Sequence, residues 1–210
     1  MKAQWGDWDA AFNRTFYQPN SMVIGATSAH MQLAQILEKV APLVGQGQDM
    51  AEYTSFLQRS RGLYNRYYEN KTEPFLYVDG VEQTVMLLPL TLGFVPDSLV
   101  AKAQAWLIHD IETTRSMHLS TGATGTRLLF PYLSEIGRTD LAAEIAAQST
   151  YPSHGYWITQ GATTAWENWS GKADATHGNA QPTHNHIVSP RVFTQPFASA
   201  TCSLTGHGES

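Results

Sequence analysis

A glutamate between two tryptophans is the residue of this sequence best suited to proton-transfer chemistry. Glu167 lies in the run Gly161-Ala-Thr-Thr-Ala-Trp-Glu-Asn-Trp169 and is one of few acids in a long aromatic segment. Indole faces stack on the CH surfaces of sugar rings, and a carboxylate in an apolar wall can be tuned for acid–base work. The same run also fits two core indoles beside a solvated or paired carboxylate. Spacing alone leaves both interpretations open.

A second aromatic and acidic cluster occurs near the start of the chain, in Trp5-Gly-Asp-Trp-Asp9. Asp7 and Asp9 flank Trp8, and carboxylates accept hydrogen bonds from the vicinal hydroxyls of sugars. The alternative is a terminal turn with a docking indole and an exposed acid. Physical chemistry alone favours this alternative.

Two histidines separated by one residue, His184 and His186, resemble half of a metal site. No Cys or acid stands at a ligand-like spacing from them, so we expect hydrogen-bonding or core histidines instead. The sequence also has no phosphate-binding loop, dinucleotide fingerprint or nucleophile elbow. We therefore expect no metal and no cofactor.

Composition excludes several classes of protein. The chain has 210 residues, of which 42% are hydrophobic, enough to bury a core. Its net charge of −5 argues against a nucleic-acid partner, and no run approaches the ~18 apolar residues of a membrane span. A single cysteine, Cys202, excludes an internal disulfide. The first residues lack a signal-peptide pattern, so we expect a cytoplasmic rather than a secreted chain.

Helical periodicity dominates the elements that must position these residues. Apolar residues recur at intervals of three and four, and no stretch alternates as a strand would. The sequence therefore predicts an all-α fold, an array of αα-hairpins. The predicted pairs are 26–44 with 49–67, 81–92 with 97–111, and 128–136 with 139–148.

Two further predictions concern the first helix and the end of the chain. In the first helix, one face carries the apolar residues Leu33, Ile36, Leu37, Val40, Leu43 and Val44. The segment 151–187 has no clear helical period and many aromatics, which is typical of a functional loop. We expect the tail, 188–210, to be irregular and poorly ordered.

Several motifs resemble one enzyme family in order and spacing from Trp5 to Ile187. They are Gly6-Asp-Trp8, His118-Leu-Ser-Thr-Gly-Ala-Thr-Gly-Thr126, Tyr151-Pro-Ser-His-Gly-Tyr156, the run around Glu167, and Asn185-His186. Together they are similar to the inverting α-L-rhamnosidases, six-hairpin (α/α)6 glycoside hydrolases. The resemblance implies that residues 1–187 are part of such a catalytic domain, a partial toroid.

The resemblance also implies roles for individual residues. Glu167 would be the general base that activates water, and the substrate would be a glycoside with terminal α-L-rhamnose. Family members take rhamnose from flavonoid glycosides, saponins or pectic chains. The residues that would contact the sugar or shape its pocket are Asp7, Trp8, Trp166, Trp169 and His186.

Inverting hydrolysis needs a second carboxyl, the general acid. In the family it lies in an Asp- and Arg-rich motif upstream of Gly-Asp-Trp, and this chain begins only a few residues before Gly6. Asp7, Asp9, Asp79 and Glu82 remain in principle as the acid, but none of them occupies the family's acid motif. We therefore expect a fragment without its acid, with apolar edges uncovered where further hairpins would dock. The alternative is a non-catalytic carbohydrate-binding or helical-repeat interaction protein.

Overall fold

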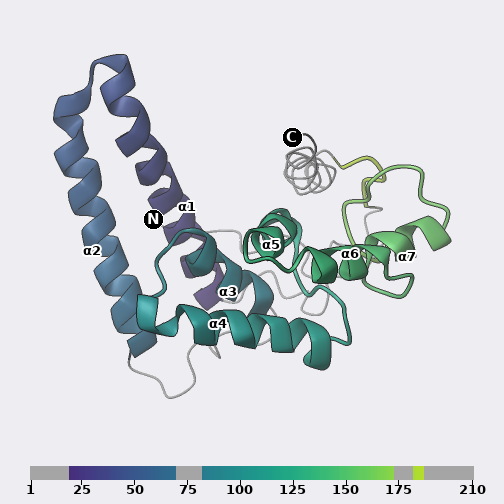
Figure 1. Cartoon of the computed structure of the whole chain (residues 1–210). Helices are drawn as coiled ribbons and strands as arrows, with labels where there is room; N and C mark the ends of the chain where they lie inside the picture. Colours follow the sequence, from purple (N-terminus) through teal and green to yellow (C-terminus); the bar gives the residue numbers. More distant parts are fainter. Residues whose placement is uncertain (1–18, 70–81, 173–181, 187–210) are drawn as a thin grey trace, which may run out of the picture.

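The structure is a computed structural model that describes residues 19–69, 82–172 and 182–186 (Figure 1). Within these ranges it is helical and has no strand, which confirms the all-α prediction. The helices are α1 (Pro19–Val40), α2 (Met50–Glu69), α3 (Glu82–Thr91), α4 (Asp97–His109), α5 (Ala123–Glu135), α6 (Thr139–Ala147) and α7 (His154–Thr159). Among the described helices, none is both long and apolar enough to cross a membrane.

The three predicted helical pairs are present. Helices α1 and α2 stand side by side and extend away from the other helices (Figure 1). Short 3-10 turns, Ala41–Val44 and Gly47–Asp49, join them. The pairs α3–α4 and α5–α6 are joined by turns in which Gly93 and Gly137 have φ of +68° and +78°. Glycine adopts this left-handed conformation without the steric cost of a Cβ, so each helix can stop sharply there.

Helix α3 is the centre of the packing, because it contacts α1, α4 and α5. Every residue from 83 to 90 is buried, including two polar ones, Gln83 and Thr84. Pro89 lies within this helix, which ends at Thr91. A single core cluster extends from α3 through α4 and α5 to the indoles of the segment that follows α7. The core therefore links the hairpins directly to the segment that carries Glu167.

The apolar face predicted for the first helix is not the face that packs. Five of its six large side chains are exposed, Leu33 by 53%, Ile36 by 50%, Val40 by 40%, Leu43 by 83% and Val44 by 62%, whereas Leu37 is partly buried. The buried residues of the same segment are Ser28, Met31, Ala34 and Ala41. Three of these four side chains, those of Ser28, Ala34 and Ala41, are small, and this strip packs although it is less apolar than the predicted face.

Several boundaries differ from the predicted ones, most of all at α1, which begins at Pro19, seven residues before the predicted start. Helix α5 begins at Ala123, five residues before the predicted start. Thr139 is the first residue of α6 rather than its cap. Helix α7 was not predicted, since its six residues are too few for a period; the Ser153 hydroxyl caps it by accepting from the Tyr156 N–H at 2.8 Å. The predicted tail and the acids Asp7, Asp9 and Asp79 lie outside the described residues, as does the side chain of Glu82.

Candidate active site

Glu167 lies where two irregular segments, 160–172 and 182–186, run side by side. Its N–H donates to the Thr183 carbonyl at 2.8 Å, and the His186 N–H donates to the Ala165 carbonyl at 2.9 Å. The Thr164 hydroxyl also donates to the His184 carbonyl. These bonds hold the two segments together on both sides of Glu167, so its backbone is fixed although it belongs to no helix.

The carboxylate of Glu167 is also held in place. Its Oε2 accepts a hydrogen bond from the Thr183 N–H at 2.8 Å, and the side chain is partly buried. A backbone N–H that donates to a carboxylate stabilises the ionised form, and such charge-assisted bonds are stronger than neutral ones. A positioned, ionised carboxylate can accept a proton from water.

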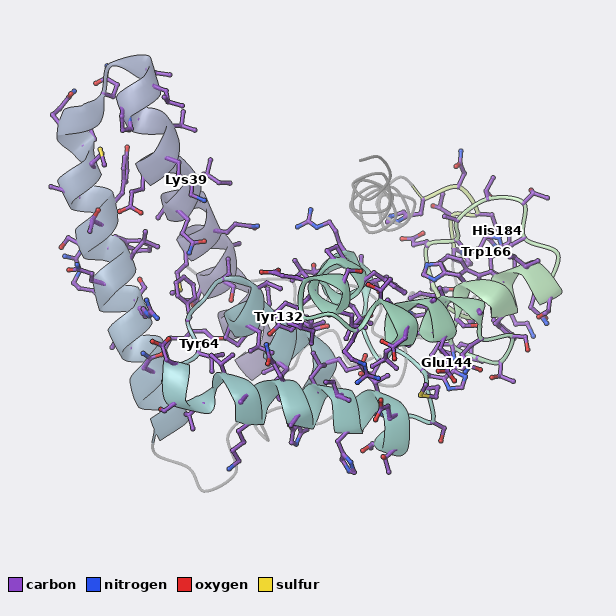
Figure 2. All side chains as sticks on the ribbon, viewed as in Figure 1. Lys39, Tyr64, Tyr132, Glu144, Trp166 and His184 are labelled. Carbon is purple, nitrogen blue, oxygen red and sulfur yellow. The ribbon has the colours of Figure 1, made fainter. Side chains whose placement is uncertain are left out.

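The indole of Trp166 is 8% exposed and is packed by two neighbours. The ring of His184 stacks on it, with centroids 4.7 Å apart and an interplanar angle of 20° (Figure 2). Nε2 of His184 hydrogen-bonds the Gly171 carbonyl at 3.0 Å. The Gly171 backbone lies so close to the indole that a Cβ there would overlap it. Trp166 is thus held rigidly beside Glu167.

Trp169 is 6% exposed and fixed by both its ring and its N–H. It stacks on Trp157 of α7 with centroids 4.7 Å apart, and the Trp157 Nε1–H donates to the Trp169 carbonyl at 3.0 Å. Its own Nε1–H donates to the Thr121 carbonyl at 2.9 Å. Two residues after Glu167, the chain is therefore anchored to α7 and to the segment before α5.

His154 lies within this aromatic cluster. Its ring meets Trp157 edge-on at 5.1 Å and Trp169 edge-on at 5.2 Å, and Phe130 lies 5.9 Å away. Burial lowers the pKa of His154 to about 4 from its ordinary value of 6.5. The imidazole is therefore neutral at pH 7 and acts as part of the core.

The predicted histidine pair separates into two different environments. His184 hydrogen-bonds the Gly171 carbonyl and stacks on Trp166. His186 is partly buried, and its Nδ1 is shielded from solvent without a hydrogen-bond partner. Among the described residues, no three His, Cys, Asp or Glu side chains form a cluster that could hold a metal.

Asn168 closes the turn that follows Glu167. It is 4% exposed, its Oδ1 accepts from the Gly171 N–H at 2.6 Å, and its Nδ2–H donates to the Lys172 carbonyl at 3.1 Å. Both ends of the amide are thus occupied by the backbone. This residue is part of an Asn-Trp-Ser sequence, but its buried amide is not available to a glycan.

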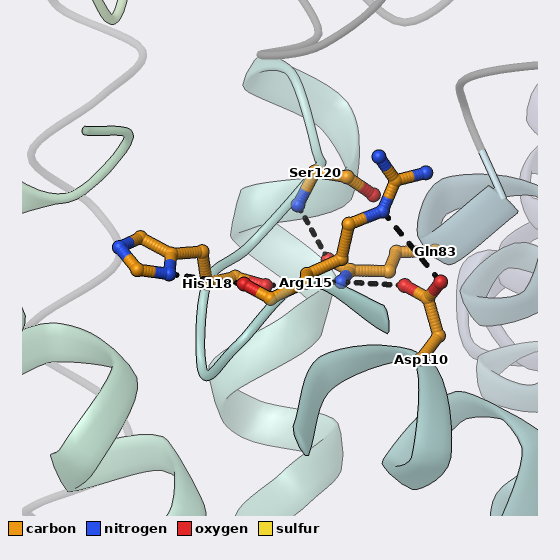
Figure 3. A network of polar contacts seen from close by, with 5 residues as sticks. All are labelled: Gln83, Asp110, Arg115, His118 and Ser120. Atoms are coloured by element: carbon orange, nitrogen blue, oxygen red, sulfur yellow. Dashed lines mark hydrogen bonds and ion pairs between the residues drawn. The ribbon is translucent and has the colours of Figure 1, made fainter. Parts of the chain in front are cut away.

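A buried polar network behind the site was not predicted from the sequence (Figure 3). Gln83 of α3 is fully buried, and Asp110, in the π-helical turn Asp110–Thr114 after α4, is 3% exposed. Gln83 hydrogen-bonds Asp110 and the backbone of 118–120, and Arg115 Nε lies 3.6 Å from Asp110 Oδ1. The signal that could have found it is an amide among the apolar residues of 81–92.

Comparison with protein families and sequences gives one consistent result. The model of the bacterial α-L-rhamnosidase six-hairpin glycosidase domain matches residues 1–195. An α-L-rhamnosidase of Streptomyces avermitilis is 35% identical over 165 residues, which are 79% of this chain and 15% of that protein. An α-L-rhamnosidase of an Alteromonas species is 47% identical over 88 residues, 42% of this chain and 10% of that protein.

Solved structures agree. An α-L-rhamnosidase from Dictyoglumus thermophilum has a TM-score of 0.77 and 30% identity, covering 90% of this chain and 20% of that one. The Streptomyces avermitilis α-L-rhamnosidase complexed with L-rhamnose has a TM-score of 0.75 and 30% identity, covering 93% of this chain and 18% of that one. The helical pairs thus fit an (α/α) toroid, and the chain spans about a fifth of these structures or less.

Proposed function

Because this chain belongs to the family of bacterial α-L-rhamnosidase six-hairpin glycosidase domains, we propose that it supplies the water-activating side of a site that hydrolyses terminal α-L-rhamnosides. Glu167 is the general base, and the substrate is a rhamnose-containing glycoside. The observation that carries this proposal is the 2.8 Å hydrogen bond from the Thr183 N–H to Glu167 Oε2. It keeps an ionised carboxylate in one place, as a base that must aim at a water molecule requires.

The proposed reaction inverts the anomeric carbon. Glu167 removes a proton from water as the water oxygen attacks that carbon, on the face opposite the departing oxygen. A general acid protonates the departing oxygen, and the two carboxyls of such pairs stand roughly 6.5–9.5 Å apart. Asp110 is not a candidate for this acid, because Gln83 and Arg115 bind its carboxylate within the core. We propose that the acid lies outside the described residues.

The sugar contacts are proposed from the same loop. Nδ1 of His186 is shielded from solvent and has no hydrogen-bond partner, and buried polar atoms of this kind usually have one. We propose that the His186 ring turns when the sugar binds, so that a rhamnose hydroxyl supplies this partner. Trp166 and Trp169 are buried and shape the pocket wall from behind. Asp7 and Trp8, which both lie outside the described residues, complete the rhamnose subsite in this proposal.

The test uses two rhamnosides that differ in leaving group. The dinitrophenolate of a 2,4-dinitrophenyl α-L-rhamnoside leaves without protonation, so hydrolysis of this substrate reports on the base alone. The alkoxide of an alkyl rhamnoside must be protonated as it leaves, so hydrolysis of that substrate also needs the acid. We expect hydrolysis of the first substrate by the chain and a loss of about 10²–10⁴-fold in Glu167→Gln. Proton NMR should show that the rhamnose initially released from the dinitrophenyl rhamnoside is the β-anomer. The α-anomer, or full activity in Glu167→Gln, would contradict the proposal.

The alternative of a non-catalytic sugar-binding module gives a different result. Such a module would show rhamnose-dependent quenching of tryptophan fluorescence with no hydrolysis of either substrate. An interaction module would respond to no sugar. The comparison of both substrates with the rhamnose titration therefore separates the three functions.

A further inference from the structure

We propose that Gln83 of α3 is a positioning residue for the loop that carries Glu167. Its buried amide fixes the segment 118–121, and that segment holds the indole of Trp169. The structural part of this inference stands on contacts within the chain. Its catalytic meaning rests on the proposed function of Glu167.

Gln83 is 0% exposed, so its side-chain amide is fully buried. Its Nε2 donates to Asp110 Oδ2 at 2.9 Å and to the His118 carbonyl at 3.2 Å, and its Oε1 accepts from the Ser120 N–H at 2.7 Å. Both donors and the oxygen are therefore in use (Figure 3). A buried amide of this kind is costly unless its polar atoms are paired, so its partners are held in register.

The hydrogen-bond partners of Gln83 determine the orientation of its amide. The His118 carbonyl can only accept a hydrogen bond and the Ser120 N–H can only donate one, and both contact the amide of Gln83. The NH2 end of Gln83 must therefore face the His118 carbonyl and Asp110, and its oxygen must face the Ser120 N–H. The amide of Gln83 thus holds the peptide group before Ser120 in place.

The segment 118–121 is connected to the candidate site through Thr121 and Trp169. The residue after Ser120 is Thr121, whose carbonyl accepts the Trp169 Nε1–H at 2.9 Å. Trp169 is also bound to Trp157 by ring stacking and by the hydrogen bond from Trp157 Nε1 to its carbonyl. Glu167 is two residues away on the same rigid loop. A shift of 118–121 would therefore displace the indole and, through it, the carboxylate.

The His118 imidazole anchors the other end of the segment. Its Nδ1 lies 2.7 Å from the Ser116 carbonyl, and its Nε2 lies 2.8 Å from the Thr150 hydroxyl, just before α7. The His118 side chain thus attaches the segment to the connection between α6 and α7 without using Gln83. Replacing Gln83 should loosen the Thr121 end of the segment while the His118 end stays in place.

The experiment follows the indole N–H peaks of the ¹⁵N-labelled chain by NMR. The peaks of Trp157 and Trp169 are assigned by their disappearance in Trp157→Phe and Trp169→Phe. In Gln83→Leu we expect the Trp169 peak to shift and its hydrogen to exchange about tenfold faster, the loss of roughly one net hydrogen bond. The matched control is Gln104→Leu, which removes a part-buried amide from α4 whose donor bonds the Tyr132 hydroxyl. It should leave the Trp169 peak unchanged.

Two results with the variants would overturn the proposal. One is a folded Gln83→Leu chain whose Trp169 peak and exchange rate are unchanged, and the other is an equal change in Gln104→Leu. If Gln83→Leu does not fold, Gln83→Asn is measured in the same way, because it keeps the amide but shortens its reach. In the unmodified chain, the Ser120 amide and the Trp169 indole should have protection factors, each taken relative to the group's own intrinsic exchange rate, within about threefold of each other. A larger difference would also contradict the coupling.

Rhamnose titration separates this inference from the proposed function. If the parent chain binds rhamnose, we expect Gln83→Leu to raise the Kd for rhamnose, measured by tryptophan quenching, about tenfold. Gln104→Leu should leave this Kd unchanged. A parent chain that neither binds nor hydrolyses rhamnosides would contradict the proposed function. The Trp169 comparison would still decide the role of Gln83.

Discussion

Glu167 and Thr183 are joined by two hydrogen bonds in opposite directions. The Glu167 N–H donates to the Thr183 carbonyl, and the Thr183 N–H donates to Oε2 of the Glu167 side chain, both at 2.8 Å. One residue thus fixes both the backbone and the carboxylate of the other, although 15 residues separate them along the chain. This arrangement gives the candidate base a defined position without a helix or a sheet.

The Thr183 N–H can be removed without losing the Thr183 carbonyl. In Thr183→Pro, Oε2 loses its donor and the carboxylate loses its fixed position, so we expect hydrolysis of the dinitrophenyl rhamnoside to fall about 10²-fold. Thr183→Ala is the matched control, since it keeps the N–H and changes only an exposed side chain. Initial rates of both variants check the prediction. Equal rates in the two variants would be incompatible with it.

His154 predicts a pH dependence of stability. Its pKa is about 4 in the folded chain and 6.5 in the unfolded one, so the unfolded state binds the proton first. Stability is therefore lost as the pH falls below 6.5, by about 2 kcal/mol between pH 7.5 and 5. Urea unfolding at both pH values measures it. His154→Phe should reduce this loss, whereas His109→Gln, at an exposed histidine, should leave it unchanged.

Gly171 predicts a packing defect next to the candidate base. Its φ is +64°, and a Cβ there would overlap the indole of Trp166. We expect Gly171→Ala to destabilise the chain by about 1–3 kcal/mol beyond the cost of its backbone conformation. Gly137→Ala is the control, because Gly137 has φ of +78° and open space around it, so it carries only the conformational cost. Similar urea midpoints for the two variants would contradict the predicted overlap.

Asn168 predicts an effect of a single charge. In Asn168→Asp the Lys172 carbonyl faces an oxygen instead of the amide donor, so we expect a loss of about 1–3 kcal/mol in unfolding free energy. Asn168→Ser is less informative, since it removes both contacts at once. The matched change at an exposed amide, Gln160→Glu, should alter stability by no more than about 0.5 kcal/mol. Urea unfolding of both variants measures the difference.

Helix positions were largely predictable because local chemistry sets them. Gly93 and Gly137 end helices where the sequence indicates, and Leu107, Ile111, Leu129 and Leu133 are buried as their spacing predicts. The buried face of α1 was not predictable. Hydrophobic spacing identifies Leu33 and Ile36 as apolar neighbours, but close approach to α2 and α3 selects Met31 and Ala34 instead. Shape complementarity between α1 and its neighbouring helices decides which face of α1 is buried. It depends on both helices of each packed pair and is not visible in the spacing of one helix.

The candidate site shows the same division. The sequence by itself determined the all-α class, the helical pairs, the family resemblance and Glu167 as the residue to examine. Only the tertiary structure decided that Thr183 holds its carboxylate, that Trp166 and Trp169 are buried, and that Gln83 lies behind them. Periodicity and capping act over a few residues, whereas these contacts join segments 16 to 48 residues apart. Their geometry exists only once the core has brought those segments together.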